Sequence, residues 1–426
     1  MKKILFIIPY IPYPLVSGGN QAFFHMTESI RQHMSVSILL FPQSSKDIDN
    51  VKNLKQIWNN IEFFIFKEKP EQLNVRHPFY YNILKSIKDS ATRKMRRQVI
   101  QETNLVRKKS TLPSSIFKPF PSSYTDYVFE VSHRGFDIIQ VEFYELISLG
   151  YLLPNDAETI FVHHELRYIH NANEMILFDK VTNEEQMMFH IAKDFERSAL
   201  QSYKHIIALT EIDKNILADF IGRNERVYAS PAVIQMKASN QRQFIPATTG
   251  RLTFVGSEDH CPNLDAVNWF CSEIAPILRE QNFSFTLQVI GCWHSKYIKK
   301  LQKLCPEMEL SGYVEDLHSF LQGSISLVPI RIGSGMRMKI LDAVTAKVPF
   351  ITTEKGVEGI DFHHKKECLV ANTSHNFATA IIQLAKDTKL QEQMTAEAIS
   401  TLQNLYQPER MLSRRLEIYK QILSEE

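Results

Sequence analysis

The stretch PIRIGSGMRMKILDA, residues 329–343, indicates a strand that ends in a glycine-rich turn and continues into a helix. The two glycines of this turn let the backbone approach a ligand closely. Free amide groups around Gly335 and Met336, together with the helix dipole, would attract an anion to the helix start. Arg337 and Lys339 add two cations at the same place. The stretch therefore predicts a site for a diphosphate.

Asp342 lies two helical turns beyond the glycine-rich turn. Its carboxylate could accept hydrogen bonds from the two vicinal hydroxyl groups of a ribose, or it could pair with Lys339, three residues earlier on the helix. A Gly-x-Gly turn before a helix is common in proteins. The function of this segment therefore depends on the fold around it.

Short apolar runs alternate with amphipathic stretches of helical length along the whole chain, which is typical of parallel sheets built from βαβ units. Strands are expected in the first half at residues 3–9, 36–41, 61–66, 137–141, 159–163 and 206–210. Strands are expected in the second half at residues 252–256, 286–291, 309–312, 326–329, 350–352 and 368–370. We therefore predict an α/β protein with two Rossmann-like, doubly wound parallel-sheet domains.

A polar stretch with little apolar content, residues 236–250, separates the two halves and is the best domain boundary. We predict a first domain over residues 1–235 and a second over residues 251–407. Residues 408–426 carry apolar side chains at helical spacing. We expect this terminal helix to pack back on the first domain.

The composition excludes several classes of protein. At 426 residues and 44% hydrophobic content the chain can bury a large core, and a formal charge of +2 provides no field that favours nucleic acid. Its five cysteines form no Cys-x-x-Cys pair, which suggests reduced thiols in a cytoplasmic protein. The apolar run after Met1 is interrupted by prolines, so we interpret it as a buried strand rather than a signal peptide.

A basic segment occupies residues 85–109, with nine Lys or Arg against two acidic residues, and an aromatic patch at residues 79–81 precedes it. Such a segment can contact an anionic membrane at its cytoplasmic face or hold a charged acceptor. It can equally be a solvated helix, because its apolar stripe is thin. No apolar stretch approaches the roughly 20 residues that span a bilayer.

A second glycine pair, Gly18 and Gly19, follows the first predicted strand and leads into a helix. It could present another set of free amides at the mouth of the first domain, or it could be an ordinary turn with a helix cap. Glu142 and Glu165 end two adjacent strands, where each could line an acceptor pocket or remain solvated.

Motifs of other enzyme classes are absent from the sequence: there is no H-E-x-x-H, G-x-S-x-G or Walker loop, and no Cys/His zinc spacing. The Asp-x-Asp string at residues 47–49 is interpreted as a helix start rather than a metal site. We therefore predict no metal and no cofactor.

Several stretches, in this order, resemble a family 4 retaining glycosyltransferase with the GT-B fold, over nearly the whole chain. They are SGG (17–19), FDIIQVE (136–142), IALT (207–210), FVGS (254–257) with Pro262-Asn263, GYVED (312–316), the glycine-rich turn at 333–342, and VPFITT (348–353) with Gly356 and Glu358-Gly359. The glycine-rich turn belongs to a G-x-G-x-R-x-K subgroup.

The resemblance implies two Rossmann-like domains that face each other across a cleft and bind a nucleotide-diphosphate sugar, with UDP or GDP as the nucleotide. It also implies retaining, metal-independent transfer of a hexose to a glycan or lipid-linked acceptor in polysaccharide biosynthesis. A nucleotide-sugar 2-epimerase of the same fold and a catalytically inactive, sugar-nucleotide-binding partner subunit remain as alternatives.

Residues and resemblance together give three sets of candidate site residues. The candidate catalytic residues are Gly19, His163, His164, Arg337 and Lys339. The candidate donor-binding residues are Gly18, Gly19, Gly256, Ser257, Gly312, Tyr313, Val314, Gly333, Ser334, Gly335, Met336, Arg337, Lys339 and Asp342. The candidate acceptor-binding residues are Glu142, Glu165 and Arg167.

The sequence departs from the family pattern at three places. Ser334 stands where the first glutamate of the family's Glu-x7-Glu pattern is usual, and Asp342 replaces the second one. Residues 257–259, Ser-Glu-Asp, stand where many members carry an arginine and a lysine. We expect Arg337 and Lys339 to neutralise the charge that grows on the departing diphosphate instead.

Overall fold

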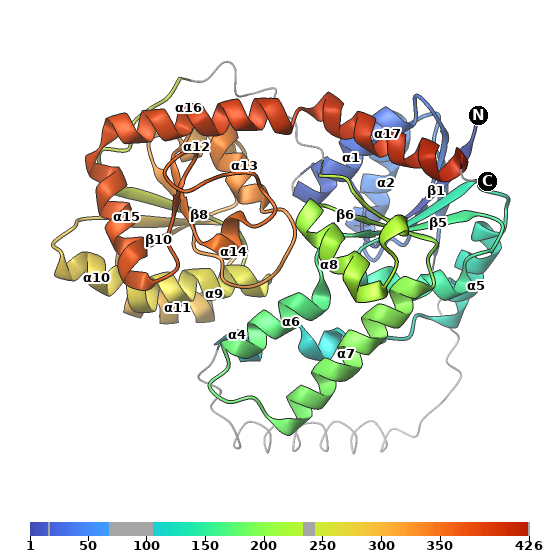
Figure 1. Cartoon of the computed structure of the whole chain (residues 1–426), viewed down its shortest axis with the longest axis horizontal. Helices are drawn as coiled ribbons and strands as arrows, with labels where there is room; N and C mark the ends of the chain where they lie inside the picture. Colours follow the sequence, from blue (N-terminus) through green and yellow to red (C-terminus); the bar gives the residue numbers. More distant parts are fainter. Residues whose placement is uncertain (16–17, 68–104, 233–242, 425–426) are drawn as a thin grey trace.

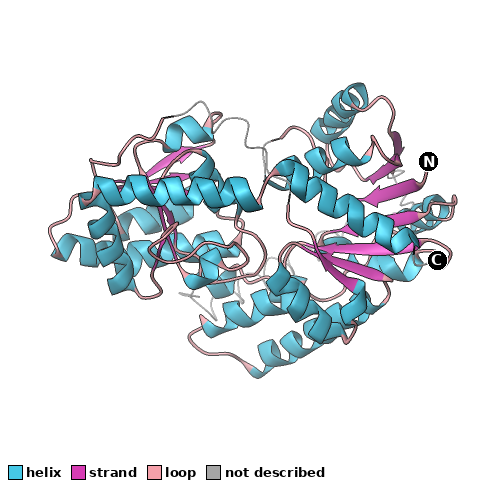
Figure 2. Cartoon of the chain, turned by 45° about the horizontal axis from the view of Figure 1, so that its top comes forward, coloured by secondary structure: helices cyan, strands magenta, loops and turns pink. Residues whose placement is uncertain are grey.

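The computed structural model describes residues 1–15, 18–67, 105–232 and 243–424, which form two α/β domains side by side (Figures 1 and 2). The first domain has a seven-stranded sheet of order β3-β2-β1-β4-β5-β6-β7, and the second has a six-stranded sheet of order β10-β9-β8-β11-β12-β13. Neighbouring strands pair in parallel in both sheets. The predicted fold class is confirmed.

The strands of the first domain are β1 (Lys3–Ile7), β2 (Ser35–Leu40), β3 (Glu62–Ile65), β4 (Ile138–Glu142), β5 (Glu158–His163), β6 (His205–Ala208) and β7 (Val227–Ala229). Its helices are α1 (Gly18–Ile30), α2 (Ser45–Ile57), α4 (Leu105–Lys108), η1 (Leu112–Ser114), α5 (Ser122–Ser132), η2 (Tyr144–Leu152), α6 (Arg167–Ile176), α7 (Asn183–Gln201), α8 (Glu211–Ile221) and η3 (Asn224–Arg226). The Asp-x-Asp string lies at the start of α2, as predicted, with Asp47 in the first turn and Ser44 as the helix cap.

The strands of the second domain are β8 (Arg251–Val255), β9 (Thr286–Ile290), β10 (Met308–Gly312), β11 (Ile325–Val328), β12 (Phe350–Thr352) and β13 (Leu369–Val370). Its helices are α9 (Cys261–Trp269), η5 (Phe270–Ile274), α10 (Ala275–Glu280), α11 (Ser295–Leu304), α12 (Leu317–Leu321), α13 (Met338–Thr345), α14 (Glu354–Val357), α15 (Ser374–Lys386) and α16 (Thr388–Leu405), and the terminal helix is α17 (Pro408–Ser424). All twelve predicted strands are present, and β7 is an additional one.

Helices cover both faces of each sheet, so central strands are buried on both sides. In β4 all five residues are buried, including the polar Gln140 and Glu142. These polar groups are not left unpaired: Gln140 Nε2 lies 2.6 Å from Glu142 Oε1, and Gln140 Oε1 accepts a hydrogen bond of 2.5 Å from Tyr419. Buried polar groups of this kind fix the position of the strand end at which the site lies.

Tyr419 belongs to α17, which crosses from the second domain onto the first and lies beside α1 (Figure 1). Ile418 and Ile422 of the same helix are buried, and Arg415 Nε donates to Ser230 Oγ over 2.9 Å. The terminal helix therefore ties the two domains together. Of the polar stretch at residues 236–250, expected to be the linker, residues 236–242 lie outside the described residues.

Most of the basic segment, including its aromatic patch, also lies outside the described residues. Its last turn, α4, packs against α9 and α6, with Val106 buried and Arg107 paired with Glu185 at 2.7 Å. All five cysteines are free. Among the helices that the structure describes, none combines the length and the apolar character that a membrane span requires.

Candidate functional site

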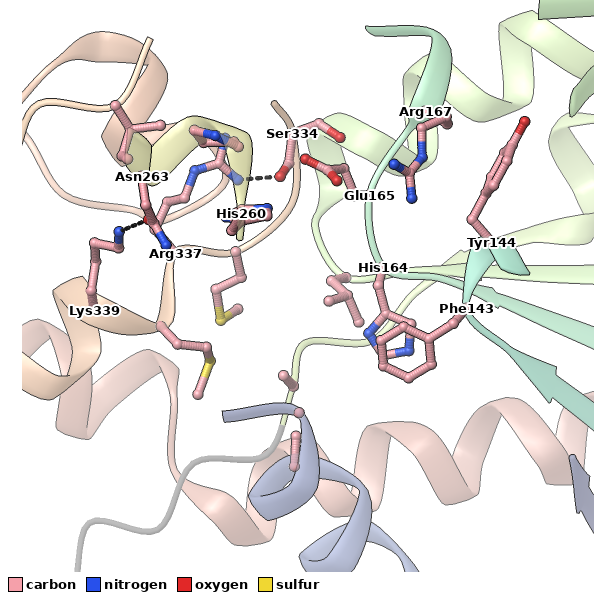
Figure 3. Close-up of a pocket in the computed structure, with 18 of the residues that line it drawn as sticks. Phe143, Tyr144, His164, Glu165, Arg167, His260, Asn263, Ser334, Arg337 and Lys339 are labelled. Carbon is pink, nitrogen blue, oxygen red and sulfur yellow. Dashed lines mark hydrogen bonds between the residues drawn. The ribbon is translucent and has the colours of Figure 1, made fainter. Parts of the chain in front are cut away.

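A cavity of about 490 Å³ lies between the two domains (Figure 3). Its first-domain wall comes mainly from α1 and from the chain that follows β4 and β5, and its second-domain wall comes from the starts of α9 and α13 and the residues just before them. The polar or aromatic residues of the first wall, with the glycine of α1, are Gly19, Phe143, Tyr144, His164, Glu165 and Arg167. Those that carry the second wall are His260, Asn263, Ser334, Met336, Arg337 and Lys339.

The glycine-rich turn lies directly against the first domain. Gly333 and Gly335 have φ angles of 99° and 80°, a backbone conformation that favours glycine. A Cβ atom on Gly335 would lie 2.4 Å from the carbonyl oxygen of His164, and one on Gly333 would lie 2.6 Å from Glu165 Oε1. The close approach that these glycines permit is therefore an approach between the two domains.

The amide groups of this turn are engaged by the first domain. The Gly335 amide donates to Asp213 Oδ2 over 3.2 Å, and the Gly333 amide donates to Asn173 Oδ1 over 3.2 Å. The prediction of a free amide at Gly335 is wrong, and α13 begins three residues later, at Met338. Local sequence could not reveal this, because both acceptors come from distant helices of the other domain.

Ser334 joins the same contact, since its hydroxyl oxygen accepts a hydrogen bond of 2.7 Å from the Leu166 amide. The turn is thus seated on the first domain through three hydrogen bonds, one each with Leu166 before α6, with Asn173 in α6 and with Asp213 in α8. These contacts fix how far the two walls stand apart.

The two predicted cations face the cavity from the second wall (Figure 3). Arg337 Nη1 donates to the carbonyl oxygens of Ser334 and, over 2.9 Å, of Gly335. Lys339 Nζ donates to Asn263 Oδ1 over 2.5 Å and lies 4.4 Å from the centre of the Phe254 ring. Neither cation makes a hydrogen bond to a carboxylate in the described part of the chain.

Burial in the cleft and the adjacent positive charge of Arg337 lower the pKa of Lys339 to about 7. The alternative pairing of Lys339 with Asp342 is not found: Asp342 Oδ1 lies 3.5 Å from His318 Nε2 instead. An anion bound in the cavity would stabilise the charged ammonium group. A negatively charged ligand would therefore bind favourably at this wall.

Glu165, on the opposite wall, belongs to a buried chain of ionisable groups. His170 Nδ1 lies 2.7 Å from Glu165 Oε1, and His170 Nε2 lies 2.9 Å from Glu174 Oε1. Burial alone would lower the pKa of His170, but the two carboxylates raise it to about 9. Burial alone would raise the pKa of Glu165, but His170 holds it well below its usual range. Glu165 is therefore a carboxylate at neutral pH.

The two histidines after β5 have different surroundings. His163 is 1% exposed, lies outside the cavity lining and has its Nε2 2.8 Å from Glu196 Oε1. Glu196 also accepts the amide groups of Arg167 and Tyr168, so it caps α6. In this structure His163 therefore lies away from the cavity, and its catalytic role stays a prediction.

His164, by contrast, faces the cavity. Its ring stacks on Phe143 with 3.8 Å between the ring centres, and its Nε2 lies 2.9 Å from Glu142 Oε2. Phe143 has a φ of 71°, which is unusual for a residue other than glycine. This backbone conformation aims the Phe143 ring at His164, so the imidazole is held on two sides.

Among the predicted acceptor residues, Glu165 and Arg167 line the cavity, whereas Glu142 lies behind His164 in a small adjoining cavity of about 30 Å³. The Arg167 guanidinium lies 4.9 Å from the centre of the Tyr144 ring.

Several of the predicted donor-binding residues do not line the cavity. Tyr313 is 66% exposed, Gly256 packs on the Asn263 side chain, and Ser257 Oγ accepts from the Cys292 amide over 3.0 Å. Gly18 begins α1, next to Gly19, which does line the cavity. The other predicted residues outside the lining are Gly256, Ser257, Gly312, Tyr313, Val314, Gly333, Gly335, Asp342, Glu142 and His163.

The sequence did not single out His260, which lines the second wall directly before α9. Part of its surface is open to the cavity, but enclosure between the domains and the nearby cations lower the pKa of its imidazole. His260 is therefore neutral at physiological pH. His260 could have been found from the sequence because it follows the predicted strand β8, and doubly wound folds bind ligands at the carboxyl ends of their strands.

Comparisons with known proteins agree with this geometry. Residues 249–387 match the family model described as Glycosyl transferases group 1. The chain is similar in structure to sucrose-phosphate synthase from Thermosynechococcus elongatus, with a TM-score of 0.69 and 12% identity over 100% of both chains. It is also similar to S. aureus TarM solved with fondaparinux, alpha-GlcNAc-glycerol and UDP, with a TM-score of 0.67 and 12% identity over 98% of this chain and 100% of that one.

Anabaena Alr3699/HepE in complex with UDP-glucose gives a TM-score of 0.65 at 11% identity, over 99% of this chain and 100% of that one. A Klebsiella pneumoniae protein named "Uncharacterized 44.6 kDa protein in cps region" is 22% identical over 268 residues, which cover 60% of this chain and 68% of that protein. The chain therefore has the two-domain fold of the GT-B glycosyltransferase structures, and its second domain matches a glycosyltransferase family model. The match to Glycosyl transferases group 1 lies within the second domain, the one that carries Arg337 and Lys339.

Proposed function

We propose that this protein transfers a hexose from a nucleotide-diphosphate sugar to a glycan or lipid-linked acceptor with retention of configuration. The observation that carries the proposal is the cavity between the domains, with Arg337 and Lys339 on one wall and His164 and Glu165 on the other. The matched domain and the UDP or UDP-glucose in two of the similar structures support a UDP donor, with GDP as the other candidate.

In this proposal the diphosphate binds at the face of the turn that carries Arg337, Met338 and Lys339. Negative charge grows on the diphosphate as the bond to the sugar breaks, and fixed cations stabilise that charge more in the transition state than in the ground state. Two side-chain cations supply this charge without a metal ion at the reacting phosphate. Because the pKa of Lys339 is about 7, the side chain is only partly protonated at neutral pH, and donor binding would favour its charged form.

The sugar is proposed to lie next to Glu165 and His164. Glycosyl transfer passes through a transition state with oxocarbenium character, so the sugar becomes positive as the diphosphate becomes negative. The Glu165 carboxylate, kept ionised by His170, is placed to stabilise that positive charge. The departing phosphate can accept the proton of the acceptor hydroxyl, so no side chain is needed as a base.

His164 and Arg167 are proposed to orient the donor sugar and the acceptor. The Phe143 ring and the Glu142 carboxylate fix the His164 ring, so the imidazole is positioned before any ligand arrives. The name of the Klebsiella relative, which refers to a cps region, supports an acceptor in surface polysaccharide synthesis. A lipid-linked acceptor would place the enzyme at the cytoplasmic face of the membrane.

A nucleotide-sugar 2-epimerase is a second candidate, because the two acid–histidine pairs, Glu142 with His164 and Glu165 with His170, lie at or beside the cavity. Such an enzyme needs acids and a histidine for proton transfer at the sugar. Product analysis separates the two functions. An epimerised free nucleotide sugar, formed with no acceptor consumed, would support the epimerase.

The test begins with a thermal-shift screen of the purified chain against UDP-, GDP- and related sugars, followed by assays of donor hydrolysis and transfer. We expect one class of diphosphate donor to stabilise the protein, and Lys339→Ala to weaken that stabilisation. Lys386→Ala, at the exposed end of α15, is the matched control and should behave as the wild type. Stabilisation without any hydrolysis or transfer would support an inactive partner subunit instead.

A further inference from the structure

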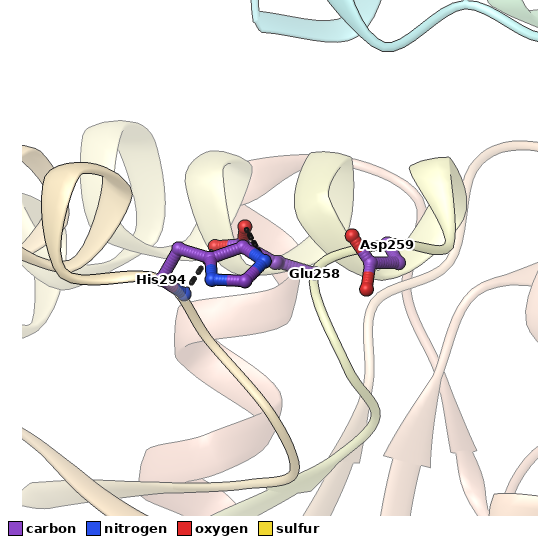
Figure 4. Close-up of side chains that lie close together, drawn as sticks. All are labelled: Glu258, Asp259 and His294. Atoms are coloured by element: carbon purple, nitrogen blue, oxygen red, sulfur yellow. Dashed lines mark hydrogen bonds and ion pairs between the residues drawn. The ribbon is translucent and has the colours of Figure 1, made fainter. Parts of the chain in front are cut away.

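A cluster of three metal-ligating side chains lies at the carboxyl ends of β8 and β9, beside but not in the cavity (Figure 4). Glu258 and Asp259 come from the chain after β8, and His294 comes from the chain after β9. One ligating atom from each residue lies within 4.8 Å of the other two. This spacing matches the requirement of a single ion, but exposed acidic clusters alone do not demonstrate one.

Glu258 supplies the independent observation. Its side chain is 0% exposed, and Oε2 accepts a hydrogen bond of 2.7 Å from the His294 amide. Oε1 accepts no hydrogen bond from the part of the chain that the structure describes. It points toward the His294 ring, whose Nε2 is 3.5 Å away. A buried carboxylate oxygen with no hydrogen-bond donor is costly, which indicates that a partner is missing at this position.

A second buried glutamate in the same domain has hydrogen-bond or ion-pair partners for both of its carboxylate oxygens. Glu367 is also 0% exposed on its side chain, and an exposed histidine, His363, lies 3.6 Å from it. Its Oε2 accepts the His363 amide over 2.8 Å, and its Oε1 receives Lys366 and Thr401 at 2.9 and 2.8 Å. The unsatisfied oxygen is therefore a property of Glu258, not of buried glutamates beside histidines in this fold.

We propose that Glu258, Asp259 and His294 bind one divalent transition-metal cation, of the Zn²⁺ or Mn²⁺ type. Glu258 Oε1, His294 Nε2 and one Asp259 oxygen supply one nitrogen and two oxygen ligands, and water completes the coordination. A mixed set of one imidazole and two carboxylates suits these ions better than Mg²⁺ or Ca²⁺, which prefer oxygen alone.

To bind the metal ion, Asp259 would have to exchange its present partner, Lys109, for the ion. Its side chain is 71% exposed, and Oδ1 now lies 3.5 Å from Lys109 Nζ. An exposed pair at this distance is weak, so a metal ion can displace the lysine. The cation would satisfy the buried Glu258 and join the chain after β8 to the chain after β9. Its role is structural, and it is distinct from the cations proposed to meet the donor phosphates.

The experiment uses tag-free, full-length protein treated with EDTA and then dialysed free of the chelator. Zn²⁺ and Mn²⁺ are titrated separately in a calorimeter, without any nucleotide sugar. We expect one equivalent of at least one ion to bind, and we expect binding to fall at least tenfold in His294→Ala and in Glu258→Gln. His363→Ala, the matched exposed histidine beside a buried glutamate, should bind as the wild type does.

His294→Ala changes an exposed ring and leaves the buried core intact, so it remains informative even if Glu258→Gln does not fold. Absence of a bound equivalent in the wild type, or unchanged affinity in His294→Ala, would overturn the proposal. Cys292→Ser tests the nearby exposed thiol as the true ligand. Loss of binding in Cys292→Ser but not in His294→Ala would also overturn it. Because no donor is present, these outcomes are independent of the transferase proposal.

Discussion

The first-domain wall of the cavity presents a carboxylate, whereas the second-domain wall presents cations. Glu165 is held ionised by His170, and Arg337 and Lys339 stand opposite without a carboxylate bonded to them in the described residues. Glu165 is close enough to act on Arg337 through its charge, but no hydrogen bond joins the two side chains in the described residues. A ligand that becomes positive at one end and negative at the other, as glycosyl transfer requires, would interact favourably with both groups.

The largest effect is expected from the cationic wall. Arg337→Ala should lower kcat/KM for transfer by roughly 10²- to 10³-fold, the range of loss when a fixed donor to a developing anion is removed. Initial rates at subsaturating donor measure this loss. Arg337→Lys keeps the charge and should recover part of the rate. A rate within threefold of the wild type in Arg337→Ala would mean that the cationic wall does not meet the reacting phosphate.

The carboxylate wall is tested by Glu165→Gln, which keeps the size of the side chain and removes its charge. We expect kcat to fall by about 10²-fold with little change in KM, because the charge acts mainly on the transition state. Glu145→Gln, a cavity-lining carboxylate whose side chain is 63% exposed, is the control and should change kcat little. If KM rises and kcat stays constant, Glu165 binds substrate but does not stabilise the transition state.

A third prediction concerns pH. The ammonium form of Lys339 is the one that binds a diphosphate, and the pKa of Lys339 in the free protein is about 7. Above that value donor binding must take up a proton, so affinity should fall by up to about tenfold per pH unit as the pH rises. Calorimetric titration with a nucleoside diphosphate between pH 6 and 9 measures the slope.

Lys339→Arg sharpens this result, because arginine stays protonated across the whole range. Its donor affinity should be nearly constant with pH, whatever its absolute value. An equal slope in the wild type and in Lys339→Arg would assign the proton uptake to another group.

The smallest effect is expected where the two walls touch. Ser334→Ala removes the hydroxyl that accepts the Leu166 amide, and one hydrogen bond is worth about 1 kcal/mol, or roughly fivefold in an equilibrium. We therefore expect a loss of a few-fold in kcat/KM, measured by initial rates. A loss as large as that of Arg337→Ala would show that Ser334 itself contacts the ligand.

The fold could be predicted almost fully from the sequence, because each strand is a short apolar run that ends at a glycine, a proline or a polar residue. The exception is β7, a three-residue strand at the edge of the first sheet, which the sequence did not single out. His164, Glu165, Arg337 and Lys339 could be found because they follow predicted strands, and parallel strands bring their carboxyl ends to one edge of a sheet.

What failed depended on contacts between the domains. The Gly335 amide meets Asp213, which is 122 residues away in the chain, and no local pattern encodes such a contact. The choice between His163 and His164 also depended on tertiary packing. His163 is the last residue of β5 and lies buried against Glu196 of α7, whereas His164 follows the strand and lines the cavity.

The most direct test of the central claim is a crystal structure of the protein with the nucleoside diphosphate selected by the thermal-shift screen. We predict that the diphosphate lies in the cavity between the domains, with its oxygens within hydrogen-bond distance of Arg337 and Lys339 and with Glu165 facing the position of the sugar. A diphosphate bound elsewhere, with Arg337 and Lys339 untouched, would contradict the account.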